Sequence, residues 1–107
     1  MSLRLEMLQV ARLARSVLGE EASALIETFL RNQQNPDGGF RDRDGNSDLY
    51  YTSFAIDALT ALQTEMPEAS LRSFLNAKAA DAGSLDFVHL CCLSRCYSAL
   101  QERPSVT

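Results

Sequence analysis

Apolar residues recur along most of this chain at the three-to-four-residue spacing of a helix, and no segment alternates as a strand would. The pattern predicts five helices, over residues 3–18, 20–33, 47–63, 67–79 and 84–101. Gly19 separates the first two helices, and the stretch Asn35-Pro36-Asp37-Gly38-Gly39 ends the second. We therefore expect a single all-α domain that spans residues 1–107.

The predicted helices differ in how much of their surface is apolar. The second and fourth carry one apolar face each, made of Ala22, Leu25, Ile26, Phe29 and Leu30 in one and Leu71, Phe74 and Leu75 in the other. The third and fifth are apolar nearly all round, which indicates helices packed on several sides. Ser84 is the predicted N-cap of the fifth helix.

This alternation is an internal repeat. Residues 23–33 align with 68–78, and residues 47–63 align with 84–101. A two-helix unit with a period of about 40 residues is typical of stacked αα-hairpins. Chance similarity between leucine-rich helices is the alternative. The aligned pairs include Ile26 with Leu71, Phe29 with Phe74, Leu30 with Leu75, Asp48 with Asp86, and Tyr51 with His89, while the polar stripe Ser53, Asp57 and Thr60 aligns with Cys91, Arg95 and Ser98.

Charge and composition exclude several classes of protein. The net charge is −4 and the ten Lys and Arg residues are scattered, which argues against nucleic-acid binding. No apolar run approaches the roughly 20 residues that a membrane-spanning helix needs. The three cysteines, Cys91, Cys92 and Cys96, share one predicted helix, where they cannot readily form disulfides. They predict reduced thiols and a cytoplasmic location.

The connection after the second helix has a recognisable structural logic. The paired glycines Gly38 and Gly39 allow the chain to reverse, and the side chain of Gln33 is placed to hydrogen-bond to backbone groups of the turn. Phe40 then closes the apolar interior of the hairpin, and Asp48 caps the third helix. We interpret these five residues as structural.

The same stretch resembles two related families. FLRNQQNPDGGF resembles the QW repeat of squalene and oxidosqualene cyclases, with Phe40 where that repeat usually has tryptophan. PDGGFRDRDGNSDLYYTSFAIDAL is similar to the repeat of protein prenyltransferase β subunits, in which a Gly-Gly turn and a charged loop precede an Asp-x-Tyr-His-Thr helix. The resemblance covers residues 29–63 well and 68–101 weakly. It implies an αα-hairpin array that forms part of an α/α-toroid; a complete toroid needs about twice as many hairpins.

The resemblance also implies an isoprenoid ligand. Arg41 and Arg43 would then face a diphosphate, and Tyr50 and Tyr51 would line an aromatic cavity. In the prenyltransferases the position of Tyr51 is a zinc-ligating histidine, and neither the partner Asp-x-Cys motif nor the complete acidic motif of the cyclases is present here. We assign no catalytic residue. The alternative for the arginines is a solvated loop, and for the tyrosines it is hairpin packing.

A zinc site is a further hypothesis. Asp86, His89 and Cys92 lie close together on the fifth predicted helix, with Cys96 one turn beyond, and nitrogen and sulfur ligands suit zinc. A core histidine beside small buried thiols is the alternative.

The segment DRDGNSD, residues 42–48, resembles the start of a calcium-binding EF-hand loop. Ser47 replaces the glycine of that loop and Ser53 its bidentate glutamate. The alternative is a solvated loop.

Two functions from different classes follow. The chain is either a piece or short relative of a toroidal isoprenoid enzyme, without complete catalysis of its own, or a non-catalytic helical module. In the second case we expect self-association or assembly with further repeats of a longer chain, because the ends of a repeat array expose apolar helix faces.

Overall fold

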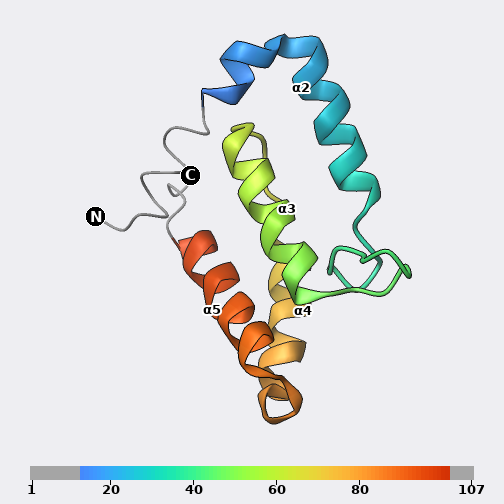
Figure 1. Cartoon of the computed structure of the whole chain (residues 1–107), viewed down its shortest axis with the longest axis vertical. Coiled ribbons are helices and arrows are strands. Elements are labelled where there is room, and N and C mark those ends of the chain that lie inside the picture. Colours follow the sequence, from blue (N-terminus) through green and yellow to red (C-terminus); the bar gives the residue numbers. More distant parts are fainter. Residues whose placement is uncertain (1–12, 102–107) are drawn as a thin grey trace.

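The computed structural model describes residues 13–101, and in that range every regular element is helical (Figure 1). The prediction of an all-α fold is confirmed. Residues 3–12 of the first expected helix lie outside the described range. The elements are α2 (Ala14–Asn32), α3 (Leu49–Ala61), α4 (Glu68–Ala80), the short 3-10 helix η1 (Ala82–Ser84) and α5 (Phe87–Gln101).

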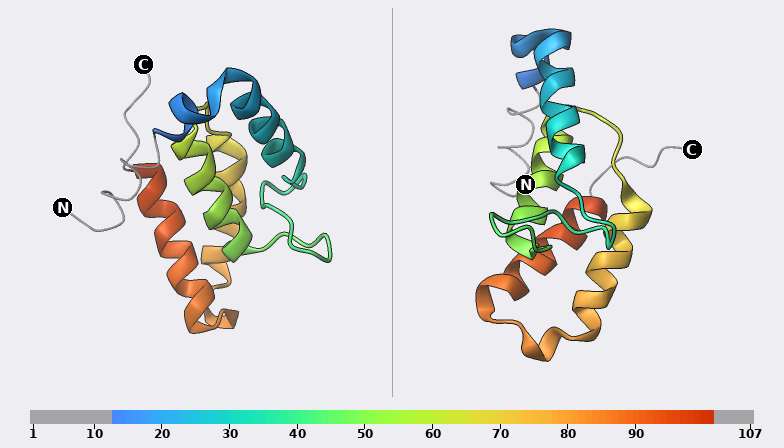
Figure 2. Two further views of the ribbon diagram at one scale, coloured as in Figure 1. Left: turned by 45° about the horizontal axis from the view of Figure 1, so that its top comes forward. Right: turned by 90° about the vertical axis from the view of Figure 1, so that its right-hand side faces the viewer.

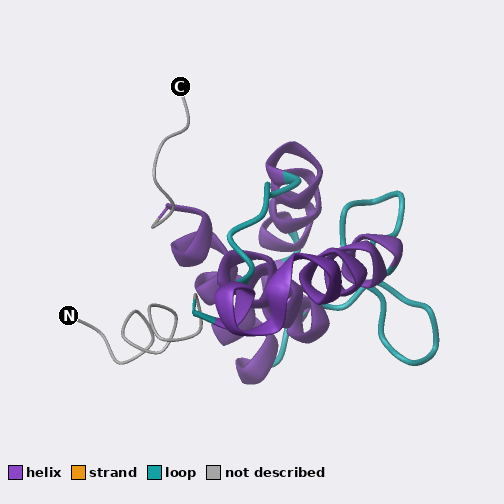
Figure 3. Cartoon of the chain, turned by 90° about the horizontal axis from the view of Figure 1, so that it is seen from above, coloured by secondary structure: helices purple, strands orange, loops and turns teal. Residues whose placement is uncertain are grey.

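The helices form two successive hairpins, α2 with α3 and α4 with α5. α3 and α5 run parallel and pack side by side, while α2 and α4 run in the opposite direction (Figures 1 and 2). α4 lies behind the α3–α5 pair, and α2 lies against α3 on the side away from α5. The view from above shows the long loop between α2 and α3 extending from the helices (Figure 3). The wider toroid implied by the resemblance stays a prediction.

Gly19 interrupts α2 where the sequence predicts a break. Its backbone has φ 84° and ψ 166°, which no helical residue adopts, so α2 consists of two helical pieces that meet there. The second piece ends at Asn32, and Arg31 in its last turn fixes its position. The Arg31 guanidinium donates to Thr64 Oγ1 at 3.1 Å and to the carbonyl oxygen of Glu65 at 2.5 Å, which ties α2 to the connection between α3 and α4.

The Gly-Gly turn reverses the chain, and α4 packs closely against it. Gly38 has φ 95°, and a Cβ at this position would lie 1.9 Å from the carbonyl oxygen of Ser70 in α4. The glutamine that stabilises this turn is Gln34 and not the predicted Gln33. Its Nε2 donates to the carbonyl oxygen of Gly38 at 2.9 Å and to Ser70 Oγ at 3.0 Å. Gln33 is instead the C-cap of α2, with its backbone amide bonded within the helix, and it lines the groove between α2 and α3.

Aspartates cap both α3 and α5. The Asp48 carboxylate accepts a hydrogen bond from the amide of Tyr51 at 3.0 Å, as predicted. α5 begins at Phe87 rather than near Ser84, and its cap is Asp86, which accepts from the amide of His89 at 2.8 Å. Ser84 lies in η1 and donates to Asp81 instead, so the prediction that Ser84 caps α5 is wrong.

The core lies between the two hairpins and includes Phe40, which is 2% exposed, as predicted. The apolar face of α4 is buried as expected, but the corresponding face of α2 is not. Leu25 and Phe29 are 68% and 63% exposed. α5 was expected to be buried nearly all round, yet Phe87, at 78%, is among the most exposed apolar residues. Both differences have one cause: among the described residues, no helix covers the outer side of either hairpin.

Candidate functional site

A groove of about 470 Å³ runs between α2 and α3 and ends at the charged loop. Its walls are mainly carbon. Residues from three segments line it, with Phe29 and Leu30 from α2, Phe54 and Ala58 from α3, and Arg41 and Arg43 from the loop. The groove thus combines an apolar wall with cationic side chains at one end.

Three of the four predicted ligand-binding residues meet in this groove. Tyr51, Arg41 and Arg43 all line it, although they are spread over a loop and a helix. Tyr50 is absent from the lining, but its ring packs edge-to-face on the rings of Tyr51 and Phe54, with centroids 6.0 and 4.8 Å away. The three rings are 45%, 37% and 53% exposed in Tyr50, Tyr51 and Phe54, so they form one exposed aromatic cluster on α3.

The charged loop is held together by its own hydrogen bonds. Asp42 Oδ1 accepts from the backbone amides of Asp44 and Asn46, at 2.9 and 3.0 Å. Arg41 donates to the carbonyl oxygen of Asn32 at 2.8 Å, which fixes the loop to the end of α2. The structure thus assigns Asp42 to backbone bonding, and within residues 13–101 no group of three candidate ligands is placed to hold a metal ion. The calcium hypothesis gains no support.

A second hollow, of about 310 Å³, is polar and lies where α3 and α5 begin. Its principal feature is His89, whose Nδ1 lies 2.7 Å from Asp86 Oδ1 and whose Nε2 lies 3.2 Å from Asp48 Oδ1. Lys78 also lines this hollow. Asp86 and His89 are neighbours on one helical turn, but Asp48 comes from the other hairpin.

The Asp86 carboxylate and the His89 imidazole shift each other's pKa. Hydrogen bonding to Asp86, and then to Asp48, raises the pKa of His89 above its ordinary value, against a smaller opposing effect of desolvation. The pKa of Asp86 is lowered, chiefly because its carboxylate accepts the His89 amide and also the imidazole. A protonated His89 between two carboxylates is therefore the favoured state in mildly acid solution.

The zinc hypothesis loses its third ligand. Cys92 is 4% exposed and Cys96 is 1% exposed, and both belong to the core between the hairpins. His89 instead faces the two aspartates, so the structure does not place Asp86, His89 and Cys92 around a common point as candidate metal ligands. The histidine is a bridge between two helix caps, since each aspartate it contacts also accepts an N–H group of its own helix.

Sequence reasoning missed the uncovered side of α5. Phe87, Val88 and Leu90 are 78%, 56% and 38% exposed, and Cys91 is exposed beside them. It also missed Phe29 and Phe54 as groove residues. A helical pattern shows which residues share a face, but it does not show whether anything covers that face. The repeat alignment shows which positions are equivalent, but which of them are exposed is known only from the structure.

Comparisons with protein-family models, with curated proteins and with solved structures give no match for this chain. None of the described helices combines the length and apolarity that crossing a bilayer would require.

Proposed function

We propose that this chain is a non-catalytic unit of a helical-repeat array of the prenyltransferase and cyclase type, and that it works by assembling with further hairpins. The observation that carries this proposal is the unequal burial of equivalent positions. Leu71 and Phe74 of α4 are 0% and 3% exposed, whereas Ile26 and Phe29, their counterparts in α2, are 38% and 63% exposed.

The exposed positions are costly to leave in water. Burial of apolar surface contributes roughly 25 cal/mol per Å², and a contiguous apolar surface on a small protein marks a site of interaction. Hairpins within a repeat array depend on their neighbours for this burial. The resemblance of residues 29–63 to a toroid repeat agrees with such a role, because in a toroid every hairpin has a neighbour on both sides.

Sedimentation velocity of the whole chain from about 1 to 500 µM tests the assembly proposal. We expect a reversible shift from monomer to a larger species within this range, as interfaces of moderate size produce. A strict monomer at every concentration would contradict assembly with copies or hairpins of this kind. Circular dichroism at both ends of the range checks that the helical content stays constant.

Isoprenoid binding is the second candidate function, and the arrangement of the groove favours it. One end is lined by Arg41, Asp42 and Arg43, which supply two guanidinium groups and one carboxylate, and the wall is aromatic and apolar. A polyprenyl diphosphate has matching halves, since guanidinium groups bind phosphate oxygens and an isoprenoid chain packs on aromatic rings. Arg41 also bonds to Asn32, so Arg43 is the side chain we expect to move most freely toward a ligand.

Isothermal titration with farnesyl diphosphate, farnesol and inorganic pyrophosphate separates the two halves of this second candidate. Farnesyl diphosphate should bind best, and Arg43→Gln should weaken it about tenfold while leaving farnesol unchanged. Arg72→Gln is the matched control, because Arg72 lies on α4 and pairs with Glu68 away from the groove. Equal binding of all three probes, or none, would contradict an isoprenoid site.

A further inference from the structure

The side of α3 that faces α5 is buried. The equivalent side of α5 in the internal repeat is exposed to solvent. Leu49 of α3 is 1% exposed and belongs to the core shared with the second hairpin, while Thr52 is 0% exposed and its Oγ1 accepts from the Phe40 amide at 2.9 Å. In the repeat alignment their counterparts are Phe87 and Leu90, which are 78% and 38% exposed. α5 therefore presents to solvent the same side that α3 presents to the next hairpin. We call this surface, Phe87, Leu90 and Cys91, the tail face.

At the opposite end of the molecule, the first hairpin also has exposed apolar residues whose counterparts in the second hairpin are buried. In the second hairpin, Cys92 and Phe74 are 4% and 3% exposed: both belong to the core shared by the two hairpins, and the Phe74 ring lies against the Gly38-Gly39 turn. Their counterparts in the first hairpin are Phe54 and Phe29, which are 53% and 63% exposed. These two phenylalanines line the groove between α2 and α3. The groove thus corresponds to the place on the second hairpin against which the first hairpin packs. We call it the head face.

An ion pair joins the two hairpins of the chain and shows which charges would meet if a further hairpin packed on α5. Between the hairpins, Arg95 donates to Asp57 at 2.9 Å. Arg95 itself aligns with Asp57, so a further hairpin of the same sequence would bring another Asp57 toward Arg95. The guanidinium has five N–H donors and its side chain is 45% exposed, so it has the capacity for a second carboxylate.

We propose that a second copy of this chain docks head to tail, with the tail face of one copy packed into the head groove of the next. This inference rests on the proposed assembly function and names its partner. The junction between the two hairpins of one chain is its template, since the new contact would continue an interface that the molecule already contains.

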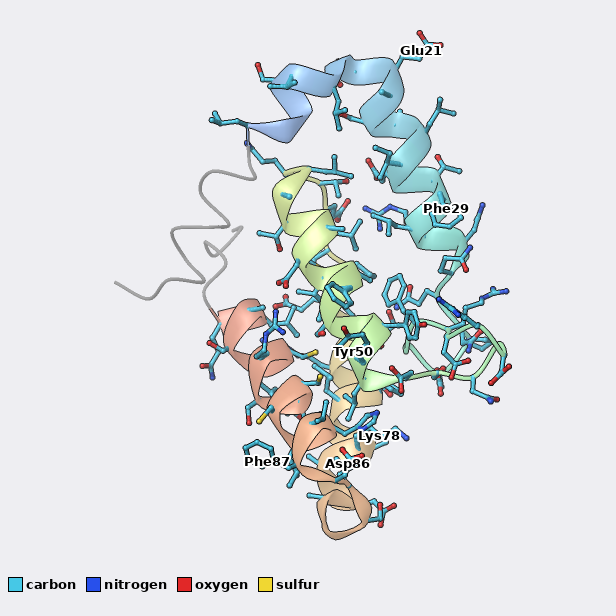
Figure 4. The ribbon with its side chains drawn as sticks, in the orientation of Figure 1. Glu21, Phe29, Tyr50, Lys78, Asp86 and Phe87 are labelled. Atoms are coloured by element: carbon cyan, nitrogen blue, oxygen red, sulfur yellow. The ribbon has the colours of Figure 1, made fainter. Side chains whose placement is uncertain are left out.

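The two faces lie on opposite sides of the molecule. Phe87 projects from the outer side of α5, and Phe29 lies beyond α3 at the far side (Figure 4). One copy can therefore use both faces at once. Such a junction is heterologous, so it yields closed rings or open chains rather than a two-fold dimer in which one face contacts itself.

Two charge variants test the inference. Phe87→Glu places a carboxylate in the tail face, and Phe29→Glu places one in the head face. Each variant alone should weaken self-association about 30-fold, as loss of a central apolar contact does. Both residues are exposed, so the fold of the monomer should be unaffected. Ala69→Glu, on the exposed side of α4, adds the same charge outside both faces and should associate like the wild type.

Mixing the two variants gives the decisive measurement. The Phe87→Glu copy keeps an intact head and the Phe29→Glu copy keeps an intact tail, so an equimolar mixture should form one-to-one heterodimers. The two variants have the same mass, so one of them is labelled uniformly with nitrogen-15, and native mass spectrometry then distinguishes the heterodimer from both homodimers. If only one of the two variants weakens self-association, or if the mixture stays monomeric, head-to-tail docking is wrong. The proposed assembly function still stands in that case, provided that the wild type associates.

Two further outcomes overturn the inference in other ways. A wild type that is monomeric at all concentrations removes both this docking and the assembly function. A Phe87→Glu monomer with a melting temperature clearly below that of Ala69→Glu would show that the tail face is covered within the chain, which leaves no place for a second copy.

Discussion

The Nε2 atom of His89 lies 3.2 Å from a carboxylate oxygen of Asp48, which belongs to the other hairpin. Asp48 caps α3, and the Nδ1 atom of the same ring contacts Asp86, which caps α5. The two helices run parallel, so their N-terminal dipole ends lie close together and each is met by a carboxylate. One imidazole thus joins the starts of the two central helices.

This bridge predicts that stability depends on pH. The pKa of His89 is raised on folding, so its contribution is complete below about pH 6.5, the usual value in an unfolded chain, and is lost as pH rises through the folded value. The pKa of Asp86 is lowered, so its contribution is present above about pH 3.9 and is lost as pH falls through the folded value. The two together place the largest stabilisation between about pH 4 and 6.5.

Melting curves of the wild type and of His89→Gln from pH 4 to 9 check this window. Glutamine can still hydrogen-bond to the aspartates but carries no titrating charge. We expect the difference in melting temperature to be largest near pH 5 and to shrink above about pH 8. A difference that stays constant over the whole range would show that the imidazolium charge does not matter.

Glycine substitutions separate close packing from backbone strain at the turn. Gly38→Ala combines an unfavourable φ with a Cβ 1.9 Å from the Ser70 carbonyl oxygen, so we expect a loss of roughly 2–4 kcal/mol in unfolding free energy. Gly45 has φ 87° with open space around it, so Gly45→Ala should cost only about 1–2 kcal/mol. Urea unfolding of both variants measures the difference, and equal losses would show that α4 does not rest on Gly38.

Two aligned phenylalanines provide a direct test of the burial pattern. Phe74→Ala removes a side chain that is 3% exposed and should lower the unfolding free energy by about 3–5 kcal/mol. Phe29→Ala removes its 63% exposed counterpart and should change it by about 0.5 kcal/mol or less at micromolar concentration. Guanidinium unfolding compares the two. A large loss for Phe29→Ala would mean that the head face is covered within the monomer.

The features that the sequence predicts well are those with local causes. The helix break at Gly19 and the cap at Asp48 both follow from residues within a few positions of one another. The prediction that Ser84 caps the last helix failed because Asp86, two residues later, is also a good capping residue, and the turn η1 occupies Ser84.

The candidate site was harder to predict because it depends on contacts between distant segments. Ile26 and Phe29 have the same spacing as Leu71 and Phe74, and only the packing of neighbouring hairpins makes one pair exposed and the other buried. His89 could be linked to Asp86 from their spacing in a helix, but Asp48 is brought to it by the parallel arrangement of α3 and α5. Arg41, Arg43 and Tyr51 were expected to share a ligand site, and their meeting in one groove makes that proposal testable without confirming it.

Thiol reactivity should report both the fold and the tail face. Cys91 is exposed, whereas Cys92 and Cys96 are buried in the core, so a thiol reagent should modify one cysteine quickly and two only on unfolding. If the tail face docks into a second copy, the rate at Cys91 should fall several-fold as protein concentration rises through the association range, because only the unassembled fraction reacts. The Phe87→Glu variant is the control, since its Cys91 should react at one rate throughout. Three equally reactive thiols in the native protein would contradict the packing of α5 against α3 and α4.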